Sequence, residues 1–344
     1  MSLTAKLYDA HGHDRTVPIH ADLLGDLAED QLLWVDAEAT DQADRQALCA
    51  LLAITQPMLD RVIDRGRAPY LDNYPSCYSF AVDAPDLRRE DGTTAPGAQL
   101  GFIVGASWML TIHDTPIRYL QGFTAQDKGE TAIGRLSPGE LAASLLDWHL
   151  TEYLSEVAAI EADVDKLDLE ILNEGTHRQV LRRIVSVRTR VSRLRALLAA
   201  QRPIFYGFTR PDFVLNLPDV AVQCYARLAH RFDRAIDEVE RTRDVVVGSF
   251  DLFTSMTTEQ TNALVKALTL LTAIIGFCGL VAGLLGMNFE LPFFKSGTTG
   301  FFEVISVLAF LSLLTLVLAR WRKWAFWVWL TGHCQSLEQC QSPE

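Results

Sequence analysis

Polar and small residues recur at alternating steps of four and three in the C-terminal part of the chain, where their types and spacing could conduct cations. This polar seam consists of Asp251, Ser255, Thr258, Asn262, Val265, Thr269, Thr272, Gly276, Gly279 and Gly283. A heptad seam that packs helices together is normally apolar. Small residues let helices pack closely in lipid, whereas polar and small groups around a water column offer oxygen atoms to hydrated ions. Because the seam runs without a break from Asp251 into an apolar segment, we favour the ion path.

Two apolar segments predict helices that cross a membrane. Residues 267–289 carry no charged side chain and supply the roughly 20 residues that a spanning helix needs. The second segment, residues 304–319, is shorter than a spanning helix needs. The basic and aromatic residues at 320–324 would anchor its far end at the membrane interface. Lys266 precedes the first segment, Lys295 stands in the connection, and three basic residues follow the second segment. The positive-inside rule therefore places both termini in the cytoplasm and the connection outside.

The charge of the chain argues against a nucleic-acid partner. The sequence has 31 Lys and Arg against 43 Asp and Glu, a formal net charge of −12, and the acidic excess lies before Leu264. An acidic body repels nucleic acid and gathers cations. The 6 cysteines are scattered without a C-x-x-C pair, which indicates a reducing compartment. The N-terminus carries no apolar stretch of a secretory signal, so we expect the front part of the chain in the cytoplasm.

The first part of the chain alternates short β-like runs with amphipathic stretches, which predicts a mixed α and β domain. Turn-forming residues in the polar segment 86–97 predict a hairpin loop between two strands. The expected strands are residues 32–35, 77–82, 100–104 and 108–113, and the expected helix is residues 41–52.

Helices dominate the chain after Ser137. The sequence Ser137–Glu140 has the form of a helix N-cap with Pro at the first helical position. A helix to about Asn173, rich in carboxylates, and a second over residues 176–201, rich in arginine, should pair antiparallel through their charges. The pattern over residues 219–288 is compatible with one continuous helix of roughly 100 Å. A helix of that length must pack in a bundle or an assembly.

Other candidate sites have weaker support. The run His11–Asp14 could bind Zn²⁺ or Ni²⁺, but a flexible polar terminus is the simpler interpretation. The tail residues His333, Cys334 and Cys340 are equally weak as a soft-metal site. No G-x-x-x-x-G-K-[ST], H-E-x-x-H or G-x-S-x-G motif occurs. We therefore expect neither an enzyme nor ATP-driven transport, and no cofactor.

The tripeptide Gly286-Met287-Asn288 stands at the end of the first apolar segment and is followed by a short loop and a second segment close to the C-terminus. With this arrangement the chain resembles the CorA-type divalent-cation transporter family, including its zinc-transporting branch. The segments Leu33–Asp36 and Ser137–Leu141 also look like the family's cytoplasmic domain. Further matching residues surround the tripeptide: Asn262, Lys266, Ala267, Leu268, Thr269, Gly283, Phe289, Glu290 and Pro292.

The resemblance implies an α+β cytoplasmic domain with a long stalk helix and two C-terminal transmembrane helices. These would assemble as a CorA-like funnel, a homopentamer in a bacterial inner membrane whose partners are its own copies, the lipid bilayer and divalent cations. The expected domains are a cytoplasmic α/β domain (1–135), an antiparallel helical pair (136–210), a stalk helix (211–263), a pore-lining transmembrane helix (264–289), an external loop (290–303), a second transmembrane helix (304–322) and a cytoplasmic tail (323–344).

The implied function is divalent-cation uptake driven by the electrochemical gradient, with Mg²⁺ as the main substrate and Co²⁺ and Ni²⁺ as further ones. Asn288 would receive the hydrated ion, because Mg²⁺ dehydrates reluctantly, while Gly286 and Met287 would shape the selectivity filter and Glu290 would lie in the external loop. The implied pore-lining residues are Asp251, Thr258, Asn262, Val265, Leu268, Thr269, Thr272, Gly276, Gly279 and Gly283.

Mg²⁺ bound between cytoplasmic domains closes the channel in this family, so the resemblance also makes Mg²⁺ a regulatory ligand here. An ungapped count places Arg227 where a regulatory acid of the stalk is expected. The carboxylates considered for this role are Asp83, Asp86, Glu90 and Asp91, facing Asp233, Asp237 and Glu238 of the stalk.

Departures from the family pattern keep other functions open. Gly276 replaces a bulky apolar residue, Gly279 replaces a hydroxyl, and the external loop is poor in acids. These differences motivate a zinc exporter or proton-coupled zinc importer of the related branch as the first alternative. A membrane-anchored helical scaffold, in which the polar seam serves packing alone, is the second.

Overall fold

The computed structural model describes residues 2–20, 23–25, 27, 28, 30–64, 69–85, 98–126, 133–172, 177–215, 217–285, 300, 302, 303, 305–314 and 317. The chain divides into two units, Met1–Met256 and Thr257–Glu344. The predicted domain boundaries are finer than this division and stay predictions.

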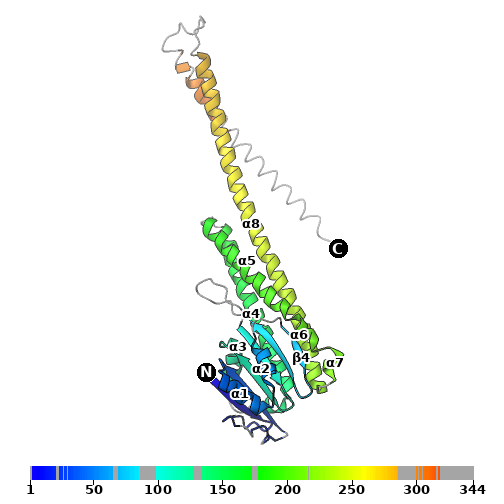
Figure 1. Cartoon of the computed structure of the whole chain (residues 1–344). Helices are drawn as coiled ribbons and strands as arrows, with labels where there is room; N and C mark the ends of the chain where they lie inside the picture. The colour runs from blue at the N-terminus through cyan, green and yellow to red at the C-terminus, as the bar shows by residue number, and fades with distance from the viewer. Residues whose placement is uncertain are drawn as a thin grey trace, which may run out of the picture. The chain divides into compact units, whose positions relative to one another are not determined.

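One sheet organises the first unit (Figure 1). Its seven strands among the described residues lie in the order β2-β1-β3-β7-β6-β5-β4. Neighbours are antiparallel except for β3 and β7, which are parallel. The strands are β1 (Ser2–Asp9), β2 (Arg15–Val17), β3 (Gln31–Glu38), β4 (Leu71–Asn73), β5 (Tyr78–Ala84), β6 (Ala98–Val104) and β7 (Trp108–His113).

The four predicted strands are confirmed as β3, β5, β6 and β7, with small shifts at their ends. The strands β5 and β6 pair antiparallel with Ala84 opposite Ala98, while the predicted hairpin loop at 86–97 lies outside the described residues. The expectation of a flexible N-terminus was wrong, because β1 pairs with β3 along its whole length and with β2 on its other side. The alternation of Leu3, Ala5 and Leu7 was the signal for this strand.

Helices account for most of the rest of the described chain. The predicted helix at 41–52 is confirmed as α1, which is capped by the Asp41 side chain, and the Ser137 cap is confirmed by its reciprocal hydrogen bonds with Glu140. The helices are α1 (Gln42–Leu52), α2 (Gln56–Ile63), α3 (Arg118–Gln126), α4 (Pro138–Leu172), α5 (His177–Ala200), α6 (Arg202–Gly207), α7 (Pro211–Val214) and α8 (Asp219–Leu285), with a single 3₁₀ turn at Ile133–Arg135.

The sheet is covered on both faces, because successive residues of a strand point to opposite sides. In β3, Leu33 and Val35 pack with α1 and α2 in one buried cluster, while Leu32 and Trp34 belong to a larger cluster on the other face. The buried Trp34 Nε1 donates a hydrogen bond to Thr111 Oγ1 of β7 at 2.9 Å. This bond joins the two parallel strands at the centre of the sheet.

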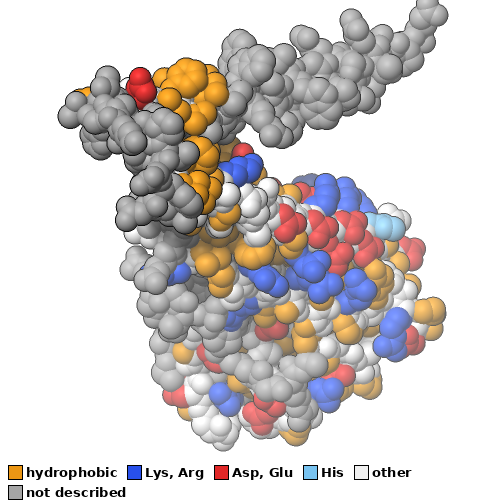
Figure 2. All heavy atoms as spheres, turned by 90° about the horizontal axis from the view of Figure 1, so that it is seen from above, with side chains coloured by type: hydrophobic (Ala, Val, Ile, Leu, Met, Phe, Trp, Pro, Cys, Tyr) orange, Lys and Arg blue, Asp and Glu red, His pale blue; other side chains and the backbone are white. Residues whose placement is uncertain are grey.

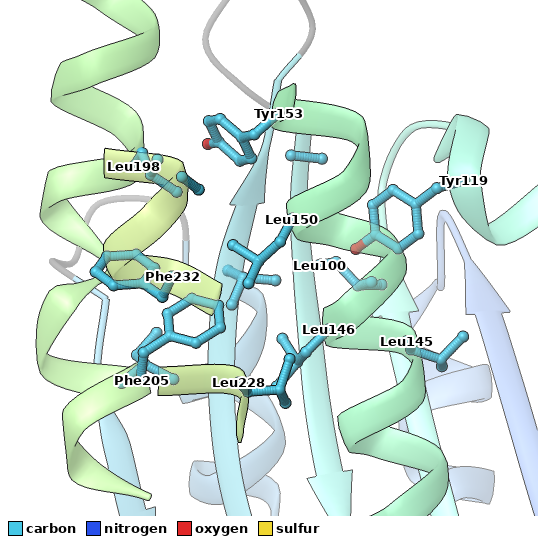
Figure 3. Close-up of a cluster of buried hydrophobic side chains, with 14 of the residues drawn as sticks. Leu100, Tyr119, Leu145, Leu146, Leu150, Tyr153, Leu198, Phe205, Leu228 and Phe232 are labelled. Atoms are coloured by element: carbon cyan, nitrogen blue, oxygen red, sulfur yellow. The ribbon is translucent and has the colours of Figure 1, made fainter. Parts of the chain in front are cut away.

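The larger cluster packs the helices α3 to α8 against the sheet, and Figure 3 shows part of it. Leu146 and Leu150 of α4 face Leu228 and Phe232 of α8 across the cluster. The rings of Phe232 and Phe205 of α6 stack with centroids 4.5 Å apart. Aromatic stacks of this kind add about 1 kcal/mol to the gain from burying their area, so they fix the lower part of α8 against the rest of the unit.

The predicted charge pairing between α4 and α5 is confirmed. Arg190 donates to Asp163 at 2.6 Å, and Arg183 pairs with Glu170. Arg195 of α5 extends the pattern to Glu240 of α8 at 3.2 Å. Basic and acidic side chains accordingly lie next to one another on the face shown in Figure 2.

In the second unit, α8 continues through an apolar stretch. Among the described residues, the helix over residues 219–284 is the one that is long and apolar enough to cross a membrane. A shorter apolar helix covers Ile305–Leu314, and apart from residue 317 the remainder of the predicted second span lies outside the described residues.

Candidate functional site

The residues of the polar seam all lie on α8 and are all exposed in the single chain. The exposed fraction is 56% for Val265 and 63% for the neighbouring Leu268. The predicted pore-lining positions from Asp251 to Gly283 are likewise exposed. A continuous helical face, polar at its start and small or hydroxylated further on, is therefore available for contact with something outside the chain.

The opposite face of α8 is the one that packs within the chain. Leu252, Phe253 and Met256 rest against the larger core cluster. In the apolar stretch the partly buried residues are Leu270, Ile274, Cys278 and Val281, and Cys278 Sγ lies 4.0 Å from Ser312 Oγ of the short apolar helix. At 3.6 residues per turn, these positions point about half a turn away from Thr272, Gly276 and Gly279.

Thr269 and Thr272 present acceptor oxygens to the surroundings. Thr269 Oγ1 donates its hydrogen to the carbonyl of Val265, and Thr272 Oγ1 donates to the carbonyl of Leu268, each at 2.8 Å. A hydroxyl that has used its hydrogen in this way keeps lone pairs that can only accept. Such oxygens suit the outward-pointing hydrogens of the water shell around a cation.

The glycines of the seam face open space. A Cβ placed on Gly276, Gly279 or Gly283 would meet no atom within 4 Å among the described residues. Packing inside one chain therefore gives no reason for three small residues in this row. The small size of these residues must therefore be explained by contacts with other copies, with lipid or with a transported ion.

The predicted filter, Gly286, Met287 and Asn288, lies outside the described residues, as does Glu290. The same holds for three of the predicted regulatory carboxylates, Asp86, Glu90 and Asp91. Their roles remain predictions.

The described regulatory candidates are not gathered within one chain. Asp83 is the second-last residue of β5, whereas Asp233, Asp237 and Glu238 lie on α8. Asp233 accepts a hydrogen bond from Tyr206 at 2.5 Å, and Glu238 pairs with Arg241. Among the described residues these acids form no group with metal-ligand spacing, so a regulatory site between copies stays a prediction.

A buried polar network at the end of β5 was missed by the sequence analysis. The carbonyl of Asp83 accepts from Tyr153 Oη of α4 at 2.6 Å and from Gln201 Nε2 at 3.0 Å. His149 Nε2 lies 2.8 Å from Gln201 Oε1, and burial lowers the pKa of His149 to about 4. No sequence signal could have joined residues that are this far apart in the chain. The network joins the C-terminal end of β5 to α4.

The described residues contain one group with metal-ligand spacing, which partly replaces the predicted run His11–Asp14. The ligand atoms of Asp9, His11 and Asp30 lie within 4.8 Å of one another. His11 Nδ1 is 3.1 Å from Asp9 Oδ1 and 3.4 Å from Asp30 Oδ2. Each of these side chains is therefore satisfied by its neighbours.

Comparison with known proteins gives a consistent result. The model of a family described as CorA-like Mg2+ transporter protein matches residues 29–323. The chain is 22% identical over 280 residues to the cobalt/magnesium transport protein CorA of Methanocaldococcus jannaschii, which covers 81% of this chain and 86% of that protein. The complete structure of that CorA magnesium transporter has a TM-score of 0.74 at 20% identity and covers 92% of this chain and 97% of the other. The ZntB cytoplasmic domain from Vibrio parahaemolyticus is similar with a TM-score of 0.57 at 11% identity, over 75% of this chain and 100% of that domain.

Proposed function

Because the chain belongs to the CorA-like Mg2+ transporter family, we propose that it is a membrane channel that conducts divalent cations, with Mg²⁺ as its main substrate and Co²⁺ and Ni²⁺ as further ones. It would act in a bacterial inner membrane as a homopentamer with both termini in the cytoplasm. The short apolar helix at Ile305–Leu314 would form part of the second span. The family is one of transporters rather than enzymes.

The observation that carries the proposal is the difference between the two faces of α8. Its polar seam is exposed, while the opposite face holds the chain's own contacts at Ile274 and Cys278. Several copies of α8 arranged with the seam inward would bury the polar row around a water-filled axis and leave the apolar side chains to lipid and to the second span. This arrangement satisfies both sets of side chains at once.

The side chains that would line the proposed pore suit a hydrated cation. Mg²⁺ gives up its water shell reluctantly, so the wall needs groups that accept hydrogen bonds from that water. The hydroxyl oxygens of Thr269 and Thr272 are such acceptors, because their hydrogens are already donated to the backbone. In the proposed pore Asn288 would select the hydrated ion at the outer end, Leu268 would form an apolar constriction, and Asp251 would add a ring of carboxylates.

The test is cation uptake by the purified full-length protein in liposomes that contain a Mg²⁺-sensitive dye. We expect uptake that follows the electrochemical gradient in the wild type and at least about a tenfold loss in Asn288→Ala, since the variant lacks the amide that receives the ion. Gln260→Ala removes an amide of the same helix that does not belong to the seam, so it is the matched control and should leave uptake unchanged. Absence of flux for every divalent cation in a folded wild-type protein would contradict the proposal and favour the scaffold.

A zinc transporter is the second candidate, and the open space at Gly276 and Gly279 favours it. With no bulky side chain at these positions, the middle of the proposed path would lack an apolar gate for a fully hydrated ion. The same liposomes with a Zn²⁺-sensitive dye separate the two candidates. Zn²⁺ flux without Mg²⁺ flux would establish the zinc transporter, and a dependence on a proton gradient would identify a proton-coupled carrier.

A further inference from the structure

A groove between α4 and the start of α8 carries an excess of positive charge. Its volume is about 690 Å³, and it belongs entirely to the first unit. Arg227, Arg231 and Arg234 line it from α8, together with His230 and Cys224. These three guanidinium groups lie within two helical turns of α8.

The acids of the groove are already engaged. Asp147 of α4 accepts from Arg231 Nη1 at 2.6 and 2.7 Å. Glu140 accepts from the backbone and hydroxyl of Ser137 at the start of α4. Arg227 and Arg234 are exposed and pair with no carboxylate in the described part of the chain. Two guanidinium groups at the groove are therefore left without an ion-pair partner among the described residues, and the three arginines exceed the two carboxylates of the lining by one charge.

An acidic edge runs along another side of the same helix. Asp233 and Asp237 lie next to α6, where Tyr206 donates its hydroxyl to Asp233 Oδ1. This bond and the nearby carboxylates raise the pKa of Tyr206. Asp237 is exposed and forms no ion pair among the described residues. The buried residues Phe232, Ala235 and Ile236 occupy the remaining side of α8.

The helix thus presents a basic edge and an acidic edge on either side of its exposed face. At about 100° per residue, Arg227 and Arg234 lie between about a sixth and a third of a turn from Asp233 and Asp237. A surface whose two edges are complementary to each other pairs head to tail with copies of itself. Contacts of that kind are heterologous, and they close into rings when the rotation permits.

We propose that the groove is the subunit contact of the cytoplasmic part, in which Arg227 and Arg234 of one copy pair with Asp233 and Asp237 of the next copy. The inference rests on the proposed function for the assembly into a ring and adds the groups that hold neighbouring copies together. The contact consists of direct charge pairs, so it needs no bridging metal. It is weakened by salt, which screens charges that remain near solvent.

The first experiment measures the mass of the full-length protein in detergent by light scattering as a function of dilution. We expect Arg227→Glu/Arg234→Glu to raise the concentration of half-dissociation at least about tenfold, because like charges then face each other across the contact. Adding Asp233→Arg/Asp237→Arg to the same chain should restore most of the assembly. Recovery by the fourfold variant also shows that the twofold variant had not merely failed to fold.

The matched control, Arg182→Glu/Arg188→Glu, reverses the charge of two exposed arginines of α5. It changes the net charge by the same amount but should leave the assembly unchanged. Equal dissociation of the control and of the groove variant would overturn the inference, as would dissociation of the wild type by a chelator at constant ionic strength. A wild type that assembles and conducts cations while the groove variant also assembles would refute the inference and leave the proposed function standing.

A cross-linking experiment tests the direction of the contact. Cys224 lies in the groove, so Asp237→Cys would place a second thiol opposite it on the neighbouring copy. A short bis-maleimide should then give a ladder that continues beyond dimers, as a head-to-tail contact requires, and Asp237→Cys/Cys224→Ser should abolish it. A ladder that stops at dimers would contradict the inference. Retained assembly in Arg227→Glu/Arg234→Glu, together with loss of a wild-type melting shift in inorganic phosphate, would instead identify an anion site in the groove.

Discussion

The two parts of α8 meet different surroundings although they form one helix. Before Met256, the helix buries side chains such as Tyr225 and Phe232 completely against the rest of its own chain. After Thr257, no described residue up to residue 284 is buried, and Leu264, Ile275 and Leu280 are 72%, 62% and 61% exposed. Exposed apolar surface on this scale requires lipid or another protein. One chain therefore suffices to define the first part, whereas the second part leaves apolar surface that the proposed membrane and further copies would cover.

The sharpest test of this comparison is to truncate one large apolar side chain in each part of α8. Phe232→Ala deletes a fully buried side chain that stacks on Phe205, and a cavity of that size costs about 3–5 kcal/mol of unfolding free energy. Thermal or urea unfolding of the protein in detergent, followed by circular dichroism, should show the loss. Leu268→Ala, at an exposed position, is the control and should leave the transition unchanged. Equal losses in the two variants would show that the apolar stretch is packed after all.

Acid should affect the first part of α8 and its neighbours much more than the second. His149 is neutral in the fold because burial lowers its pKa to about 4, while the unfolded chain binds its proton near pH 6.5. Because the unfolded chain takes up this proton first, the fold loses stability as the pH falls from 6.5 to 4, by about 3 kcal/mol over the whole window. Melting temperatures at pH 7 and pH 5 should record the first part of this loss, about 2 kcal/mol. His149→Gln can still donate to Gln201 without titrating, so a variant with the full acid sensitivity of the wild type would contradict the assignment.

The smallest expected effect concerns the exposed seam itself. Gly279→Leu fits the single chain without a clash, since no described atom lies within 4 Å of its Cβ position, so stability should not change. In a pore several copies of the new side chain would converge, and uptake should fall by about tenfold or more. Leu280→Val, one residue further and off the seam, provides the control in the same liposome assay. Unchanged uptake in Gly279→Leu would remove Gly279 from the path.

Local patterns made the helices and most of the sheet predictable. The cap at Ser137, the alternation in residues 108–113 and the unbroken pattern after Asp219 are properties of neighbouring residues, and the structure contains all three features. The polar seam was predictable for the same reason, because its members share one face of one helix. The network of Asp83, Tyr153 and Gln201 was not, since it depends on how α4 meets the sheet. The groove between α4 and α8 depends on the same packing.

The position of Met256 also has a consequence for the biosynthesis of the protein. Residues of α8 as late as Val246 are buried in the core cluster, and Leu252 to Met256 still rest against it. Ribosomes deliver the N-terminal part first, and domains begin to fold as they emerge. The core is therefore complete in sequence before the apolar stretch after Lys266 is made, so that in the proposed membrane protein the closing of the first unit and the entry of α8 into the bilayer would be consecutive steps of one translation event.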